Sequence, residues 1–461
     1  MSQGPRTFRD PFLSLYQSMM SDIAEVNSRD AALEAADDDA APKPDVIAAA
    51  ELVAARTAVA EMRAAGIESN VDQTALEDMS IPENIQVCAA LAKDLLVAKI
   101  SGNQALAKEI EEDFLPGSKC DPKWVTTINE YVKYFGPTGN LREIPYINPA
   151  AVGPKVITIK SNANIGLVGD WGTGAAPAKR VLAQLAKLKP DILIHLGDIY
   201  YSGTENECRT NFEDVVNNVL DRKGNDITVY TLAGNHDMYC GGIGYYAMLK
   251  RLNKPAMAQP ASFFCLRAED NSWQLLAMDT GKHDFSPVAV THAETYIADD
   301  ELDWHEARVR EFPGMTILLS HHQLFSAFSQ IGKAQPNGRS LSYNPRLKSV
   351  FDRLQATGKK IPAWFWGHEH NLCIYRPYLG LEYGRCLGHS AIPVVVQDNP
   401  YEIVAEIDDP PTIVEEAKLS VSNGVYAHGF AMLRLQPSAV AVDYFEDRNG
   451  TAQCTYSETI R

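Results

Sequence analysis

Residues 164–198 read NIGLVGDWGTGAAPAKRVLAQLAKLKPDILIHLGD. The spacing of the apolar residues predicts, in order, a strand over 164–168, a helix over 178–188 and a strand over 191–196. Each strand is followed by a Gly-Asp pair, and Asp198 follows Asp170 by 28 residues, a length that suits one β-α-β crossover. Since neighbouring parallel strands end at the same edge of a sheet, we expect the two carboxylates to lie close together there.

The same arrangement recurs further along the chain. Strands are predicted over 228–232, 262–266, 273–278, 316–319 and 363–366, helices over 302–309 and 345–354, and antiparallel strands over 429–435 and 439–444. Five polar motifs follow strand-like runs: Gly169-Asp170-Trp171-Gly172, Gly197-Asp198-Ile199-Tyr200-Tyr201, Gly234-Asn235-His236-Asp237, Ser320-His321-His322 and Gly367-His368-Glu369-His370. The pattern predicts an α/β fold with one site built from strand ends. The glycine-rich stretch 239–246 is expected to be a mobile loop beside that site.

These motifs carry the side chains of a metal site. Carboxylates, an amide oxygen and imidazoles suit Fe, Mn or Zn, and one carboxylate can bridge two ions about 3.5–4 Å apart. Asp198 is the best candidate for the bridge because it is central among the early motifs. Tyr201 is the most informative residue, since a phenol with a pKa near 10 is a poor ligand for a divalent ion, whereas a trivalent iron holds it deprotonated.

Together these motifs resemble those of the calcineurin-like metallophosphoesterase superfamily, and within it those of the purple acid phosphatase branch. Other branches usually carry a metal-binding histidine where this chain has Gly172, and they lack the tyrosine; here Gly172 and Tyr201 occur together. The resemblance covers roughly residue 156 to the C-terminal end. It implies a β-sandwich flanked by helices, in the layer order α/β/β/α, preceded here by an all-α N-terminal region.

The resemblance also implies a set of roles for the site residues. Fe(III) would be held by Asp170, Tyr201, His370 and Asp198, and a divalent ion (Fe, Mn or Zn) by Asn235, His321, His368 and the same Asp198. His236 would face the phosphate, oriented by a carboxylate for which Asp237 is the candidate, and a metal-bound hydroxide would attack phosphorus. His322 could donate a proton to the leaving group or only hold its loop, and the sequence leaves both readings open.

The amino-acid composition and net charge limit the classes of molecule that this protein is expected to bind. The 461 residues include 59 acidic and 42 basic side chains, for a formal net charge of −17. This balance argues against general nucleic-acid or anionic-membrane binding and favours a small phosphorylated substrate drawn in by the metals. No apolar export signal opens the sequence, which favours the cytoplasm, although a chain whose signal had been removed would be exported. In that compartment the eight cysteines are expected to be reduced.

The chain is expected to have three parts. Residues 1–125 read as Ala-rich helices with an acidic linker near 30–45, residues 126–155 as a connecting segment, and residues 156–461 as the catalytic domain. The helical region suits packing or homo-oligomerisation better than catalysis.

The leading hypothesis for function is hydrolysis of phosphomonoesters. A phosphodiesterase acting on cyclic nucleotides or phospholipid headgroups is the alternative that keeps the chemistry. The other alternative is not an enzyme: a partner-binding scaffold with a regulated metal domain.

Overall fold

A computed structural model describes residues 143–461 except 225, 287–293, 395 and 423, together with 105, 108, 130, 131 and 133–135. The chain divides into two units, Met1–Leu141 and Arg142–Arg461. The predicted acidic linker, and the predicted N-terminal helices apart from residues 105 and 108, lie outside the described residues.

Two mixed sheets form the centre of this unit. The first has the order β15-β14-β13-β2-β3-β4, and the second has the order β1-β5-β6-β7-β8-β10-β9. The strands of the first are β2 (Asn164–Val168), β3 (Ile192–His195), β4 (Thr228–Thr231), β13 (Gly429–Gln436), β14 (Ala439–Arg448) and β15 (Thr451–Ile460). The strands of the second are β1 (Ile157–Ile159), β5 (Phe264–Ala268), β6 (Trp273–Ala277), β7 (Met315–Leu319), β8 (Ala363–Trp366), β9 (Leu372–Ile374) and β10 (Tyr383–Leu387).

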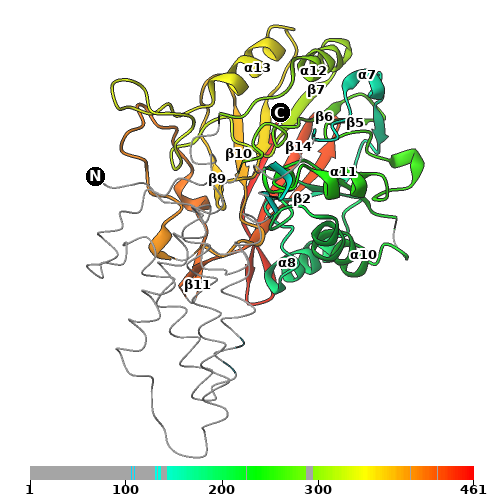
Figure 1. Ribbon diagram of the computed structural model, residues 1–461, viewed down its shortest axis with the longest axis horizontal. Helices are drawn as coiled ribbons and strands as arrows, with labels where there is room; N and C mark the ends of the chain where they lie inside the picture. Colours follow the sequence, from blue (N-terminus) through cyan, green and yellow to red (C-terminus); the bar gives the residue numbers. More distant parts are fainter. Residues whose placement is uncertain are drawn as a thin grey trace, which may run out of the picture. The chain divides into compact units, whose positions relative to one another are not determined.

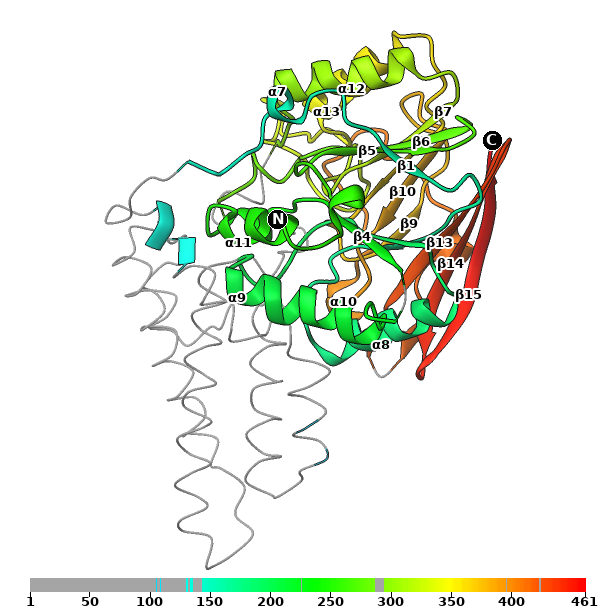
Figure 2. The same cartoon turned by 90° about the vertical axis from the view of Figure 1, so that its right-hand side faces the viewer.

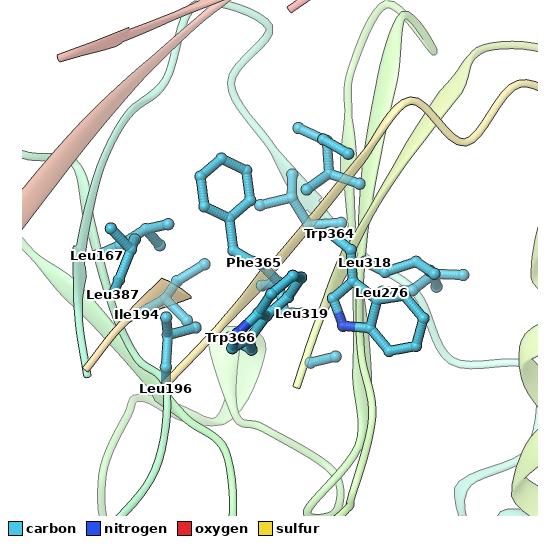
Figure 3. Packing of buried hydrophobic residues seen from close by; sticks show 14 of the residues in the cluster. Leu167, Ile194, Leu196, Leu276, Leu318, Leu319, Trp364, Phe365, Trp366 and Leu387 are labelled. Atoms are coloured by element: carbon cyan, nitrogen blue, oxygen red, sulfur yellow. The ribbon is translucent and has the colours of Figure 1, made fainter. Parts of the chain in front are cut away.

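The sheets pack face to face because their strands are apolar on the inner side. In β3, Ile192 and Ile194 belong to the cluster between the sheets, while the alternate residue Leu193 belongs to a second cluster on the other face. This alternation follows from the two-residue period of a strand. Figure 3 shows Leu167 and Ile194 of the first sheet with Trp364 and other residues of the second.

Helices cover both outer faces of the sandwich (Figures 1 and 2). The first sheet is covered by α8 (Ala176–Lys187), α10 (Asp214–Val219) and α11 (Ile243–Leu249), and the second by α12 (Asp299–Glu311) and α13 (Pro345–Gln355). The shorter elements are α7 (Pro149–Val152), α9 (Glu205–Glu207), a π-helical turn (Cys208–Glu213), 3₁₀ turns (His236–Met238, Pro255–Met257, Val396–Asp398, Glu415–Ala417), β11 (Val421–Ser422) and β12 (Val425–Tyr426). The α/β/β/α layer order expected from the sequence is confirmed.

Most predicted elements of this unit have their expected type, and one expectation is wrong. The stretch 239–246, predicted as a mobile loop, leads into α11, and Tyr245 and Tyr246 are buried in the core. The elements that were not predicted include β1, β9, β15 and the helical segment 205–219. No helix in the described part of the chain is long and apolar enough to cross a membrane.

Candidate metal centre

The predicted ligands lie at the carboxyl ends of five strands. Strands β2, β3 and β4 are parallel neighbours in one sheet, and β7 and β8 are parallel neighbours in the other. Three of the residues that follow them, Asp170, Asp198 and His368, have positive φ angles of 53°, 76° and 72°. Non-glycine residues seldom adopt this conformation, and it is enriched at functional sites. These tight turns direct the side chains into one buried space.

One group of donor atoms consists of Asp198 Oδ2, Asn235 Oδ1, His321 Nε2 and His368 Nδ1. Asn235 Oδ1 lies 3.1 Å from both imidazole nitrogens, which are 3.2 Å apart, and His321 Nε2 lies 3.4 Å from Asp198 Oδ2. Donors about 2.1 Å from one ion lie about 3.0–3.4 Å from each other in octahedral or tetrahedral arrangements. The spacing therefore suits a single metal ion.

The protonation of this group also calls for a cation. His321 Nδ1 is 2.9 Å from the carbonyl oxygen of Leu196, which can only accept, so Nδ1 carries the proton and Nε2 presents a lone pair. The Asn235 amide donates to the Tyr239 hydroxyl at 2.5 Å, which turns its oxygen toward the same space. A lone pair that faces acceptor oxygens is unfavourable unless a positive ion lies between them.

A second group of donors shares the same Asp198 oxygen. The Tyr200 hydroxyl lies 3.0 Å from Asp170 Oδ1, 3.2 Å from Asp198 Oδ2 and 3.1 Å from His370 Nε2, and the last atom is 3.1 Å from Asp170 Oδ1. Asp170 and Asp198 are fully buried. Two buried carboxylates beside each other need compensating positive charge, which metal ions would supply.

The tyrosine in this group is Tyr200, whereas the sequence predicted Tyr201. Tyr201 contributes main-chain groups: its N–H donates to Glu207 Oε1 at 2.6 Å and its carbonyl accepts from His236 Nδ1 at 2.8 Å. The peptide bond between the two tyrosines is cis.

His236, which was predicted to face the phosphate, lies beside the Asp198 carboxylate. Because Nδ1 donates to the Tyr201 carbonyl, Nε2 is directed toward the donors and is 3.9 Å from Asp198 Oδ2. Its ring is held between the rings of Tyr200 and Tyr239, with both centroids at 4.6 Å. The orientation of this imidazole is thus fixed by a carbonyl and two aromatic rings.

Asp237, the candidate for orienting His236, makes different contacts. Its carboxylate accepts from the main-chain N–H groups of Gly234 at 2.8 Å, Asp198 at 3.0 Å and Ile199 at 3.2 Å. Burial, and then the charge of Asp198, raise the pKa of this carboxyl well above its usual range. Asp237 therefore ties the turn after β3 to the turn after β4.

His322 is held at both ring nitrogens. Nδ1 is 2.9 Å from Thr280 Oγ1 and Nε2 is 3.0 Å from Asp284 Oδ2, while the ring centroid lies 4.4 Å from that of His368, a predicted ligand. These contacts favour the loop-holding reading of His322 over proton donation.

Sequence reasoning missed several residues that shape the site. The Ser390 hydroxyl accepts from the Gly169 N–H at 3.1 Å, across 221 residues of chain, and no local pattern signals such a pair. Gly234 is needed for space, since a Cβ atom there would lie 2.1 Å from Asp198 Oδ1. A glycine before Asn-His was visible in the sequence and could have been read as a close approach.

Part of the chain is similar to a known protein family. Residues 163–372 match the family model described as calcineurin-like phosphoesterase. The sequence matches no curated protein.

Three solved structures are similar to this chain at low sequence identity. A purple acid phosphatase from yellow lupin seeds (Lupinus luteus) has 13% identity and a TM-score of 0.42 over 66% of this chain and 54% of its own. PhoD has 9% identity and a TM-score of 0.42 over 69% of this chain and 70% of its own. GAP50, the anchor in the inner membrane complex of Plasmodium, has 12% identity and a TM-score of 0.41 over 65% of this chain and 89% of its own.

The matched range contains all seven predicted ligands and Tyr200. The match supports a phosphoesterase domain, which is a domain of hydrolases that cleave phosphate esters, at these residues. The chain therefore carries a calcineurin-like phosphoesterase domain at residues 163–372.

Proposed function

We propose that this domain is a two-metal phosphoesterase of the purple acid phosphatase type that hydrolyses small phosphomonoesters. The observation that carries the proposal is the pair of donor groups that share Asp198 Oδ2. A carboxylate common to two ligand sets is the arrangement that brings two ions within the about 3.5–4 Å used in two-metal hydrolysis.

The two donor groups differ in chemistry, which supports two different ions. One contains a phenol oxygen, Asp170 and His370, a set that suits Fe(III) because a trivalent ion stabilises the phenolate. The other contains an amide oxygen and two imidazoles, which suit a divalent Fe, Mn or Zn. When bound, the pair of ions would lower the pKa of a water molecule and neutralise charge on the phosphate oxygens.

The protein's own part is to hold and orient the substrate beside these donors. His236 has its Nδ1 proton committed to the Tyr201 carbonyl, so a second proton can be held only at Nε2, on the side of Asp198. There it would donate to a phosphate oxygen or to the leaving group. Because the ring is fixed by its neighbours, little orientational freedom is lost when substrate binds.

Hydrolysis of a chromogenic phosphomonoester and of its matching diester by the full chain, loaded with iron and manganese, tests the proposal. Asp198→Asn removes charge from the shared ligand, and Asp226→Asn, at an exposed ion pair with Lys254, is the matched control. We expect the protein to prefer the monoester. Asp198→Asn should lose turnover, and the control Asp226→Asn should keep it. Preference for the diester would instead indicate a phosphodiesterase. No turnover of either ester by metal-replete protein would contradict the proposal and favour a partner-binding scaffold.

A further inference from the structure

We propose that the tyrosine ligand of this chain is Tyr200, and that Glu207 and Asn211 hold the turn that places it there. The inference rests on the proposed metal centre and assigns a residue within it. The spacing of the Gly197-Asp198 motif points to Tyr201, three residues after the aspartate. The geometry points to its neighbour.

The Tyr200 hydroxyl lies within 3.2 Å of three predicted ligand atoms, on Asp170, Asp198 and His370. Its side chain is fully buried. A phenol has one proton to donate, so it can satisfy one of these three neighbours at a time. A metal ion at the centre of the four atoms would satisfy all of them, with the phenol deprotonated.

The main-chain N–H and carbonyl groups of Tyr201 both form hydrogen bonds, and these bonds hold the turn and orient His236. Its N–H donates to Glu207, and its carbonyl accepts from His236. The two adjacent tyrosines thus have different roles. The hydroxyl of Tyr200 lies beside the predicted metal ligands, and the carbonyl of Tyr201 orients the His236 imidazole. Neither main-chain contact of Tyr201 requires a tyrosine side chain.

A single carboxylate organises the turn that produces this division. Glu207 accepts from the main-chain N–H groups of Tyr201 at 2.6 Å, Ser202 at 3.2 Å and Thr204 at 3.0 Å, and from the Thr204 hydroxyl at 2.8 Å. Thr204 and Glu207 also form a capping box at the start of α9. The turn after Tyr200 is therefore fixed to the helix that follows it.

Asn211 holds the other side of the same turn. Its Nδ2 donates to the carbonyl oxygen of Tyr200 at 2.8 Å from the π-helical turn Cys208–Glu213. Gly203 closes the turn with φ +60°, and a Cβ atom there would lie 2.6 Å from the Cα atom of Asp237. With Glu207 and Asn211 both in place, a shift that exchanged Tyr200 for Tyr201 would break contacts on each side.

Visible absorption of the iron-loaded full chain tests the assignment, because a phenolate bound to Fe(III) gives a charge-transfer band. The variants are Tyr200→Phe and Tyr201→Phe, compared at matched iron content. We expect Tyr201→Phe to keep the band and Tyr200→Phe to lose it. A band lost in Tyr201→Phe and kept in Tyr200→Phe would overturn the assignment, as would a band kept in both variants or absent from iron-bound wild-type protein.

Two further readouts keep the test decisive. If Tyr200→Phe fails to fold, as judged by circular dichroism, the Tyr201→Phe protein still decides, because loss of its band overturns the assignment and retention supports it. Glu207→Gln should shift the band without removing it, and an unchanged band would refute its positioning role. The band depends on iron and phenolate alone, so a retained band without ester hydrolysis would count against the proposed function and leave this assignment intact.

Discussion

Replacement of Asp237 by asparagine separates two roles for this residue. If Asp237 orients the His236 ring, the change should lower turnover and little else. The contacts instead predict damage to the metal site and to the fold, because the carboxylate joins the turn after β3 to the turn after β4. Asparagine has nearly the same shape, so the change alters charge and hydrogen bonding while leaving packing intact.

The expected magnitude follows from three hydrogen bonds. One carboxylate oxygen accepts from Asp198 N and Gly234 N, and the other accepts from Ile199 N. An asparagine oxygen can keep the first pair, but its NH₂ group then meets the Ile199 N–H, donor against donor. One charge-assisted bond of about 1.5–3 kcal/mol is lost and a buried donor is left unsatisfied, while removal of a buried charge offsets part of the loss. We expect a net loss of about 2–4 kcal/mol.

The assay is chemical unfolding of metal-free protein, followed by metal content after reloading. Asp237→Asn should lower the free energy of unfolding by the stated amount and reduce bound metal, since both turns carry predicted ligands. Asp226→Asn, at an exposed position, should change neither quantity. Unchanged stability and full metal content, with a selective fall in kcat, would refute the reasoning and restore the orienting role.

Three other predictions use different parts of the domain. Burial lowers the pKa of His195 from 6.5 to about 3, so between these pH values only the unfolded chain takes up the proton and stability falls as the pH falls. His195→Gln should therefore remove about 1.4 kcal/mol per pH unit from the slope of unfolding free energy against pH. Equal slopes for the two proteins would contradict this. Tyr239→Phe frees the Asn235 amide to rotate and should weaken the binding of one divalent ion about 10–100-fold by titration, with unchanged affinity as the contrary result. Chelation should lower stability by about 3–4 kcal/mol at metal concentrations of 100–1,000 times Kd, and a Tm that is unmoved by chelator would argue against a bound metal.

Much of the site could be predicted because the end of a strand can be recognised in the sequence, where an apolar run is followed by glycine and a polar residue. The predicted strands 164–168 and 363–366 coincide with β2 and β8, and the Gly-Asp and Gly-His pairs follow them directly. Because β2 and β3 are parallel neighbours, backbone geometry alone brings Asp170 and Asp198 to one edge of their sheet, and the parallel pair β7 and β8 does the same for His321 and His368 in the other sheet. Little side-chain detail is needed for that step.

The tyrosine that lies beside Asp170 and His370 could not be predicted in the same way. A difference of one residue between Tyr200 and Tyr201 is decided by a turn, and the turn is fixed by Glu207 and Asn211 on elements that apolar periodicity did not reveal. Similarly, the role of Asp237 depends on amides of a neighbouring strand's turn, about 38 residues earlier. Contacts of this kind arise from the fold and leave no local pattern.

Strand β15 was missed because it is an edge strand with few buried residues. Its side chains are mostly exposed or half-buried, so the apolar alternation used to recognise strands is absent. A signal was nevertheless present: Asn449-Gly450 joins β14 to β15, and both residues have positive φ, 53° and 81°. An Asn-Gly pair between extended segments is the strongest short-range sign of a hairpin.

The most direct test of the two-metal account is anomalous diffraction from crystals of the full chain loaded with iron and manganese. We expect two peaks about 3.5–4 Å apart, with the Asp198 carboxylate between them, Asp170 and His370 beside one peak, and His321 beside the other. A single peak, or two peaks that share no carboxylate, would contradict it.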